Sequence, residues 1–188
     1  HIAKGADISI ATIPVGDREA PEFGILKAND DNLITSFIEK PAKELLPLWE
    51  SETGEEMKLQ GRKYLASMGI YIFNRKFLFD QLLIDKVDAT DFGKEIIPAS
   101  ISTQKVVSFQ YDGYWTDIGN IYSFYEANLA LTLEIPPFNL FDNTKAIFSR
   151  ARMLPPMKIG NTHVEHSILA EGSIIDASRI VSSVIGIR

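Results

Sequence analysis

The feature that most constrains the fold is a six-residue repeat near the end of the chain. Pairs of large aliphatic residues recur at Ile168-Leu169, Ile174-Ile175 and Ile180-Val181, with small residues between them. This spacing is typical of a parallel β-helix, in which each short strand forms one side of a coil. A run of ordinary short strands is the alternative. The spacing breaks at Val184-Ile185, so we expect few complete coils.

The earlier part of the chain follows a different pattern, that of an α/β domain. Alternating or continuous apolar runs predict strands at 7–14, 23–27, 33–38, 64–73 and 105–111. Capping residues and amphipathic spacing predict helices at 43–49, 75–83, 90–98 and 121–133. Residues 134–156 show no clear period and are predicted to connect two domains.

Some of these segments also carry predictions about burial and boundaries. The segment 64–73 is apolar almost throughout, which predicts a strand buried on both faces. The helix 75–83 is amphipathic, and its predicted inward residues are Phe77, Leu78, Leu82 and Leu83. The helix 90–98 is predicted to end at its proline. Residues 50–63 are predicted to form a mobile loop.

Composition and charge exclude several classes of protein. The 188 residues suit one domain and part of a second, and the 45% hydrophobic and 23% charged residues are ordinary for a globular protein. A net charge of −6 without a Lys/Arg block argues against a nucleic-acid surface or a basic membrane helix. The absence of cysteine excludes disulfide and thiolate chemistry. No apolar run approaches the roughly 20 residues that span a bilayer. Because the chain begins at His1, we expect it to be part of a longer protein.

The most chemically distinctive stretch is residues 111–120, which holds three aromatic residues and two aspartates. It lies between a predicted strand and a predicted helix, a usual place for a site in α/β proteins. Asp117 suits a hard cation such as Mg²⁺, which takes oxygen ligands. The alternative is structural: Trp115 belongs to a core, and Asp117 caps the helix that begins near Asn120. The residues alone favour neither interpretation.

The predicted strand 33–38 runs into Glu39-Lys40-Pro41. Pro41 favours an extended Lys40, so the two charged side chains are expected on opposite faces. Lys40 could bind a phosphate as a point charge, and Glu39 could accept hydrogen bonds from sugar hydroxyls. An exposed ion pair at a sheet edge is the alternative, which local sequence alone favours. His163 and His166 are interpreted as surface residues, because no Asp, Glu or Cys cluster surrounds them.

Four motifs in a fixed order carry a family resemblance. They are Phe-Ile-Glu-Lys-Pro at 37–41, Ala-Ser-Met-Gly-Ile-Tyr-Ile-Phe at 66–73, Asp-Phe-Gly-Lys-Glu-Ile-Ile-Pro at 91–98 and Tyr-Trp-Thr-Asp-Ile-Gly at 114–119. Together with the tails at 152–156 and 183–188 they resemble the glucose-1-phosphate adenylyltransferase (ADP-glucose pyrophosphorylase) family. Each motif is weak alone, since Glu-Lys-Pro recurs across sugar-nucleotide pyrophosphorylases, but the set is specific.

The resemblance implies an α/β fold with three parts. Residues 1–133 would be the C-terminal, sugar-phosphate half of a Rossmann-like nucleotidyltransferase domain, 134–156 a connection, and 157–188 the start of a left-handed parallel β-helix. The implied reaction is ATP plus glucose 1-phosphate giving ADP-glucose and pyrophosphate, with Mg²⁺, for glycogen or starch synthesis. The resemblance further implies a homotetramer in the cytoplasm, or in the plastid of a plant, that binds neither nucleic acid nor membrane.

The resemblance also implies roles for individual residues. Lys40 would grip the sugar phosphate and Glu39 would bind glucose hydroxyls. The remaining pocket residues would be Ser67, Tyr71, Asp91, Phe92 and Trp115. Asp117 would be one of two metal-binding aspartates, and with Lys40 it would carry the catalysis. An anionic phosphate attacks in line, so positioning and charge neutralisation suffice without a protein nucleophile.

The chain departs from the family in two respects. The glycine-rich triphosphate loop and the first metal aspartate lie before the residue that matches His1, so we expect the isolated chain to be inactive. Thr116 stands where bacterial members often carry Arg and plant-like members Glu. Two alternatives for the parent protein therefore stay open. It could be a non-catalytic regulatory paralogue, or another sugar-nucleotide pyrophosphorylase, including one whose β-helix is an acyltransferase.

Overall fold

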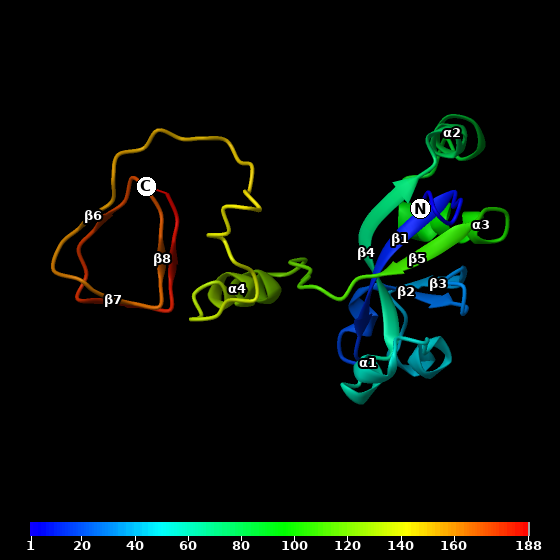
Figure 1. Cartoon of the computed structure of the whole chain (residues 1–188), viewed down its shortest axis with the longest axis horizontal. Helices are drawn as coiled ribbons and strands as arrows, with labels where there is room; N and C mark the ends of the chain where they lie inside the picture. Colours follow the sequence, from blue (N-terminus) through cyan, green and yellow to red (C-terminus); the bar gives the residue numbers. More distant parts are fainter. Residues whose placement is uncertain (188) are drawn as a thin grey trace. The chain divides into compact units, whose positions relative to one another are not determined.

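Apolar segments of the first 113 residues build one mixed sheet in the computed structural model, which describes residues 1–187 (Figure 1). Its strands are β1 (Ile8–Val15), β2 (Gly24–Ala28), β3 (Ile34–Glu39), β4 (Tyr64–Phe73) and β5 (Val106–Gln110), in the order β3-β2-β4-β1-β5. β1 and β5 run parallel, and the other neighbouring pairs are antiparallel. Every predicted strand is confirmed, with its ends within one residue of the predicted positions.

The two edges of this sheet meet at one point. β3 and β5 are the first and last strands across the sheet. Nevertheless, Leu33, just before β3, forms an antiparallel bridge with Val107 of β5. Beside it, the Ser108 amide donates to the Asn32 carbonyl over 2.8 Å. The sheet therefore curls strongly, and the start of β3 is covered by β5.

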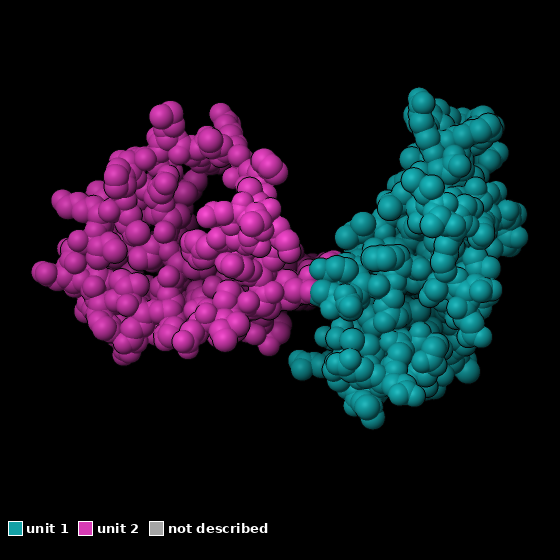
Figure 2. Space-filling model, in the orientation of Figure 1, with its two compact units in different colours: residues 1–113 teal, residues 114–188 magenta. Residues whose placement is uncertain are grey.

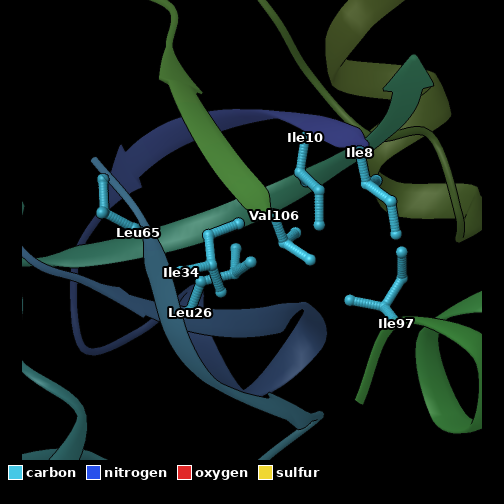
Figure 3. Packing of buried hydrophobic residues seen from close by; sticks show 7 residues of the cluster. All are labelled: Ile8, Ile10, Leu26, Ile34, Leu65, Ile97 and Val106. Atoms are coloured by element: carbon cyan, nitrogen blue, oxygen red, sulfur yellow. The ribbon is translucent and has the colours of Figure 1, made fainter. Parts of the chain in front are cut away.

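The core of the first unit lies on the concave side of this sheet. Seven buried residues form one cluster, which Figure 3 shows from close by: Ile8, Ile10, Leu26, Ile34, Leu65, Ile97 and Val106. Each strand contributes residues of one face, as the period of two requires. Ile97, from the helix α3 (Ile97–Ile101), closes the cluster opposite the strands. Burial of such side chains stabilises a fold by about 1.5–3 kcal/mol each, so this cluster holds α3 on the sheet.

The helices are short, and several are tighter or wider than an α-helix. The α-helices are α1 (Glu55–Leu59), α2 (Arg75–Asp80), α3 and α4 (Ile121–Ala130). The 3₁₀ turns are η1 (Ala20–Glu22) and η2 (Lys43–Trp49), and the π turns are η3 (Gln81–Asp85) and η4 (Phe92–Ile96). None of the helices within residues 1–187 is long and apolar enough to cross a membrane.

Three helix predictions need correction. The segment predicted as a loop after residue 49 contains α1. The predicted helix 90–98 continues through Pro98, because this proline lies in the first turn of α3, where an amide hydrogen has no helical partner. Leu83 is 67% exposed and not inward, because the chain turns into a π-helix at η3, which shifts the helical faces.

The predicted burial of β4 on both faces is wrong for its second half. Residues 64–67 are buried, whereas Ile70 is 52% and Ile72 is 56% exposed. β2 pairs with β4 only at Leu65 and Ala66 among the described contacts. Beyond them β4 continues along β1 without β2 at its side, so one face lacks the cover of neighbouring elements. An apolar run in the sequence indicates a buried strand only where other strands or helices pack against both of its faces.

Residues 114–188 form the second compact unit, coloured magenta in Figure 2. This unit contains a parallel β-helix. Its strands are β6 (Lys158–Ile159), β7 (His163–Glu165), β8 (Ile168–Leu169), β9 (Ile174–Ile175), β10 (Arg179–Val181) and β11 (Val184–Ile185). β6 pairs with β9, β7 with β10 and β8 with β11, all in parallel. One coil therefore stacks on the next, and the predicted β-helix is confirmed.

The coil length differs from the repeat expected from the sequence. Val184 pairs with Ile168, and Arg179 pairs with His163, so each coil repeats after 16 residues. Val184-Ile185 is therefore in register with the coil below, and the predicted break is wrong. Two sides of each coil are spaced by five residues, because their corners are tight. His166 and Ser182, at equivalent corners, have positive φ angles of 42° and 46°.

Candidate functional site

A bulge in β4 brings two of the predicted site residues together. Thr12 of β1 pairs with Ser67 and Ile10 pairs with Tyr71, so three residues of β4 face a single residue of β1. Gly69 lies in this bulge with a φ of 69°, a conformation that glycine adopts at little cost. In a regular strand, residues four apart are separated by about 13 Å. Here the hydroxyl oxygens of Ser67 and Tyr71 lie 3.5 Å apart.

The ring of Tyr71 continues this surface toward another predicted site residue, Phe92. The two rings are stacked, with centroids 6.1 Å apart and planes inclined by 29°. Phe73 contacts the ring of Phe92 as well, at 5.5 Å between centroids. Because Phe92 is the first residue of η4, these contacts hold the start of η4 against β4. Ser67, Tyr71 and Phe92 thus form one continuous surface.

Two carboxylates lie near the start of η4, in space left by two glycines. Gly24 of β2 pairs with Glu39 of β3, and a Cβ atom at Gly24 would stand 2.8 Å from Oε2 of Glu39. A Cβ atom at Gly93 would stand 3.2 Å from the same oxygen and 3.4 Å from Oδ1 of Asp91. The carboxylates of Glu39 and Asp91 therefore share the space in front of Gly93. The side chain of Asp91 also accepts a hydrogen bond from the Lys94 amide at 3.0 Å.

Lys40 has a backbone conformation that the sequence did not predict. Its φ is 47°, in the left-handed region, rather than extended. Its amide donates to the Phe23 carbonyl over 3.0 Å, which prolongs the β2–β3 hairpin by one step, while buried Pro41 turns the chain away. β3 ends at Glu39, so the alternation of side chains along a strand does not extend to Lys40. A left-handed residue with a Cβ atom costs about 1–2 kcal/mol, and such residues cluster at functional sites.

Trp115 and Asp117 belong to the second unit. Asn120 caps α4, since its side-chain oxygen accepts from the Ser123 amide at 2.8 Å. The structural alternative, in which Asp117 caps this helix, is therefore wrong. Trp115 is partly exposed, not a core residue. Asp117 is exposed, and within residues 1–187 neither a hydrogen bond nor an ion pair engages its carboxylate.

The exposed carboxylate of Asp117 has the chemistry that Mg²⁺ prefers, an anionic oxygen donor that keeps room for water and phosphate. The carboxylate folds over Gly119, where a Cβ atom would stand 2.7 Å from Oδ2. Among the residues that the structure describes, no group of three or more His, Cys, Asp or Glu side chains could hold a metal ion. Asp117 thus fits a cation as one ligand of an incomplete set.

Other polar features involve different residues. A cavity of about 670 Å³ is lined by Lys27, Ala28, Asn29, Thr35, Glu50, Ser51, Glu52, Lys58 and Lys63, none of them a predicted site residue. Its lysines are largely paired, as in the 2.6 Å contact between Lys63 and Glu50. His163 and His166 are exposed, as predicted, and Nε2 of His163 lies 2.6 Å from Glu165.

The structure adds residues that sequence reasoning missed. Gly24 and Gly93 clear the space for the two carboxylates, and Phe37 packs beside them. A glycine inside a predicted strand signals close approach of another group, and that signal was present at Gly24. Glu95 accepts hydrogen bonds from the backbone in front of η4, and an acidic residue shortly after an N-cap is a known signature.

Gly24 offers a test of this packing. A Cβ atom there would stand 2.5 Å from the Phe37 ring, which is partly buried and packs on the core. We expect Gly24→Ala to destabilise the chain by about 1–3 kcal/mol, as overpacking does. Gly93→Ala, with its nearest contact at 3.2 Å, is the milder control. Urea denaturation of both variants measures the difference, and equal small losses would show that Phe37 swings away freely.

Two family models match the chain. The first, described as nucleotidyl transferase, matches residues 1–134. The second, described as the GLGC left-handed parallel beta-helix domain, matches residues 152–188. The matched ranges contain the curled sheet and the stacked coils, respectively.

Proposed function

Because the chain belongs to the nucleotidyl transferase family, we propose that it carries the sugar-phosphate side of a glucose-1-phosphate adenylyltransferase. The first match covers more than half of the chain, and it is followed by a β-helix domain of the GLGC type. This order of domains fits that enzyme and supports a sugar-nucleotide pyrophosphorylase. The four motifs of the sequence support the more specific assignment.

The proposed reaction joins ATP and glucose 1-phosphate. A phosphate oxygen of the sugar phosphate attacks the α-phosphorus of ATP, the bond to the β-phosphate breaks, and ADP-glucose and pyrophosphate form. The attacking oxygen is already anionic, so no side chain has to act as a nucleophile or remove a proton. The residues of this chain have to bind the sugar, orient its phosphate and balance charge.

The observation that carries the proposal is the convergence of unlike groups around η4. The carboxylates of Glu39 and Asp91 share the space in front of Gly93 and can accept hydrogen bonds from several sugar hydroxyls. The stacked rings of Tyr71 and Phe92 offer an apolar surface for the C–H groups of a sugar. Hydroxyl acceptors beside a ring surface suit a hexose better than a flat or wholly apolar ligand.

The charges of the site also orient the ligand. Two adjacent carboxylates repel a phosphate, so the sugar hydroxyls face Glu39 and Asp91 and the phosphate faces the other way. Lys40 follows Glu39 directly, is exposed, and can neutralise the phosphate as a point charge. The left-handed backbone of Lys40 costs free energy. Such strain is common at functional sites, which supports a role of the Lys40 side chain in binding the phosphate. Ser67, beside Tyr71, adds a hydroxyl to the pocket.

Asp117 and Trp115 complete the proposal from the second unit. Asp117 would hold Mg²⁺, which when bound supplies charge neutralisation for the reacting phosphates. Trp115 is proposed to line the sugar pocket, on the basis of the family resemblance. By the family resemblance, the first metal aspartate and the triphosphate loop would lie before the residue matching His1. We therefore propose that residues 1–188 alone bind sugar phosphate without transferring the adenylyl group.

The setting of the enzyme is proposed on the same basis. The full-length enzyme would serve glycogen or starch synthesis in the cytoplasm, or in the plastid of a plant. It would work as a homotetramer whose partners are ATP and glucose 1-phosphate rather than nucleic acid or membrane. The net charge of −6 agrees with the absence of a nucleic-acid surface.

Calorimetric titration of residues 1–188 tests the proposal. Glucose 1-phosphate should bind, whereas glucose 6-phosphate, with the same charge, should bind about tenfold or more weakly, because its hydroxyls cannot meet Glu39 while its phosphate meets Lys40. Equal binding of both would reject the site. Stronger binding of another sugar 1-phosphate would favour another pyrophosphorylase. Absence of ADP-glucose formation by a full-length enzyme containing these residues would favour the regulatory alternative.

A further inference from the structure

Glu95 holds the backbone that precedes η4 without belonging to the proposed pocket. Its Oε1 accepts a hydrogen bond from the Thr90 amide at 2.9 Å and one from the Asp91 amide at 3.1 Å. The Thr90 hydroxyl donates to the same oxygen over 3.3 Å. Three donors of two successive residues therefore converge on one carboxylate oxygen, and Glu95 itself is exposed.

Asp91 in turn accepts hydrogen bonds from backbone amides of η4. The Asp91 side chain accepts from the Lys94 amide at 3.0 Å, and the Glu95 amide donates to the Asp91 carbonyl over 3.1 Å. This is a reciprocal capping arrangement, in which each end of the turn satisfies backbone donors of the other. The acidic residue stands one position later than in the usual capping box, which fits the wider turn of the π-helix at η4.

We propose that Glu95 is a positioning residue of the sugar-phosphate pocket, acting through the Thr90–Asp91 backbone. That backbone carries the Asp91 carboxylate to the space in front of Gly93, beside Glu39. The next residue, Phe92, is carried onto the ring of Tyr71. One carboxylate thus sets two parts of the pocket, its hydroxyl acceptor and its ring surface. The inference rests on the proposed function, because it concerns the binding of the same sugar phosphate.

The hydrogen bonds indicate that the length of the Glu95 side chain matters more for its role than its charge. The backbone hydrogen bond from Thr90 is the main cause that lowers the pKa of Glu95, while the nearby Asp91 charge works in the other direction. The donors require an acceptor oxygen at the end of a side chain of this length. Aspartate keeps the charge but is shorter by about one C–C bond, roughly 1.5 Å, and cannot reach both amides. Glutamine keeps the reach and an acceptor oxygen but loses the charge.

Glu95→Asp and Glu95→Gln therefore separate reach from charge. Both variants of residues 1–188 would be titrated with glucose 1-phosphate by calorimetry, with circular dichroism to establish that they are folded. We expect Glu95→Asp to weaken binding about tenfold, because the Thr90 and Asp91 amides lose their acceptor, and Glu95→Gln to stay within about threefold of the original chain. Glu55→Ala, at an exposed glutamate in the first turn of α1, is the control and should leave binding unchanged.

The outcomes distinguish a positioning role of Glu95 from a purely structural role and from failure of the proposed function. Unchanged binding in Glu95→Asp, or weaker binding in Glu95→Gln than in Glu95→Asp, would overturn the positioning role and leave the proposed function standing. Equal weakening in both variants, accompanied by equal loss of thermal stability, would show that Glu95 serves the fold alone. If the original chain fails to bind glucose 1-phosphate, the proposed function fails and the inference falls with it.

Discussion

Asp117→Asn is expected to lower kcat by about two to three orders of magnitude in a full-length enzyme that contains these residues, since the magnesium ion that Asp117 is proposed to hold would supply several kcal/mol of charge stabilisation. The fold should persist. Asp117 is exposed, and within residues 1–187 no hydrogen bond or ion pair depends on its carboxylate. Asn120, not Asp117, caps α4. Asparagine keeps the shape of the side chain and removes the charge that a magnesium ion requires.

The measurement is kcat as a function of magnesium concentration, together with thermal unfolding of each variant. The Asp117→Asn enzyme should need more magnesium to reach its reduced maximum. Asp112→Asn is a matched control, because Asp112 is a second exposed aspartate of the same 111–120 stretch. It should leave both kcat and the magnesium dependence unchanged. A variant that unfolds, or one that loses activity with the original magnesium dependence, would contradict the metal role of Asp117.

The strands were predictable because their signal is local. Alternation of apolar and polar side chains depends on the backbone of one strand, so the positions of all five sheet strands follow from the sequence. Burial depends on neighbours. Ile70 and Ile72 are as apolar as the buried first half of β4, yet they are exposed because β2 does not extend beside them. The order of strands and the contact of Leu33 with Val107 could not be read from any single segment.

Lys40 shows how a local rule fails against a longer-range contact. A residue before proline favours an extended backbone. The hydrogen bond from the Lys40 amide to the Phe23 carbonyl, and the burial of Pro41, impose the left-handed conformation instead. Similarly, the β-helix was predictable from its apolar pairs, but its 16-residue coil depends on the corners, where His166 and Ser182 adopt positive φ angles.

The identities of the proposed site residues came from the family resemblance, and the structure adds how five of them meet. Ser67 reaches Tyr71 through the bulge at Gly69, and Tyr71 reaches Phe92 by stacking. Glu39 and Asp91 meet only because Gly24 and Gly93 leave room. That room could not be predicted, since it depends on which residue of β3 lies opposite Gly24. The register of a hairpin is a property of two strands and their turn.

Lys40→Ala is expected to weaken the binding of glucose 1-phosphate to residues 1–188 by about 30-fold, equivalent to roughly 2 kcal/mol for a charge-assisted phosphate contact. In a full-length enzyme the KM for ATP should stay nearly unchanged. Lys43→Ala removes the same charge from an exposed lysine at the start of η2 and is the matched control. If both variants weaken binding alike, the effect is general electrostatic attraction, and Lys40 makes no specific phosphate contact.

Lys40→Gly separates the phosphate contact from the strain of the backbone. Glycine and alanine both lack the amine, so both variants should bind glucose 1-phosphate equally weakly. The usual order of stability, in which an alanine variant is more stable than a glycine variant, should not hold at this position. Glycine within a strand or helix costs about 0.5–1 kcal/mol relative to alanine, but at a φ of 47° it avoids the left-handed penalty of about 1–2 kcal/mol. Lys40→Gly should therefore be at least as stable as Lys40→Ala in urea denaturation. A less stable glycine variant would show that the surroundings relax around Lys40 and that its backbone holds no strain.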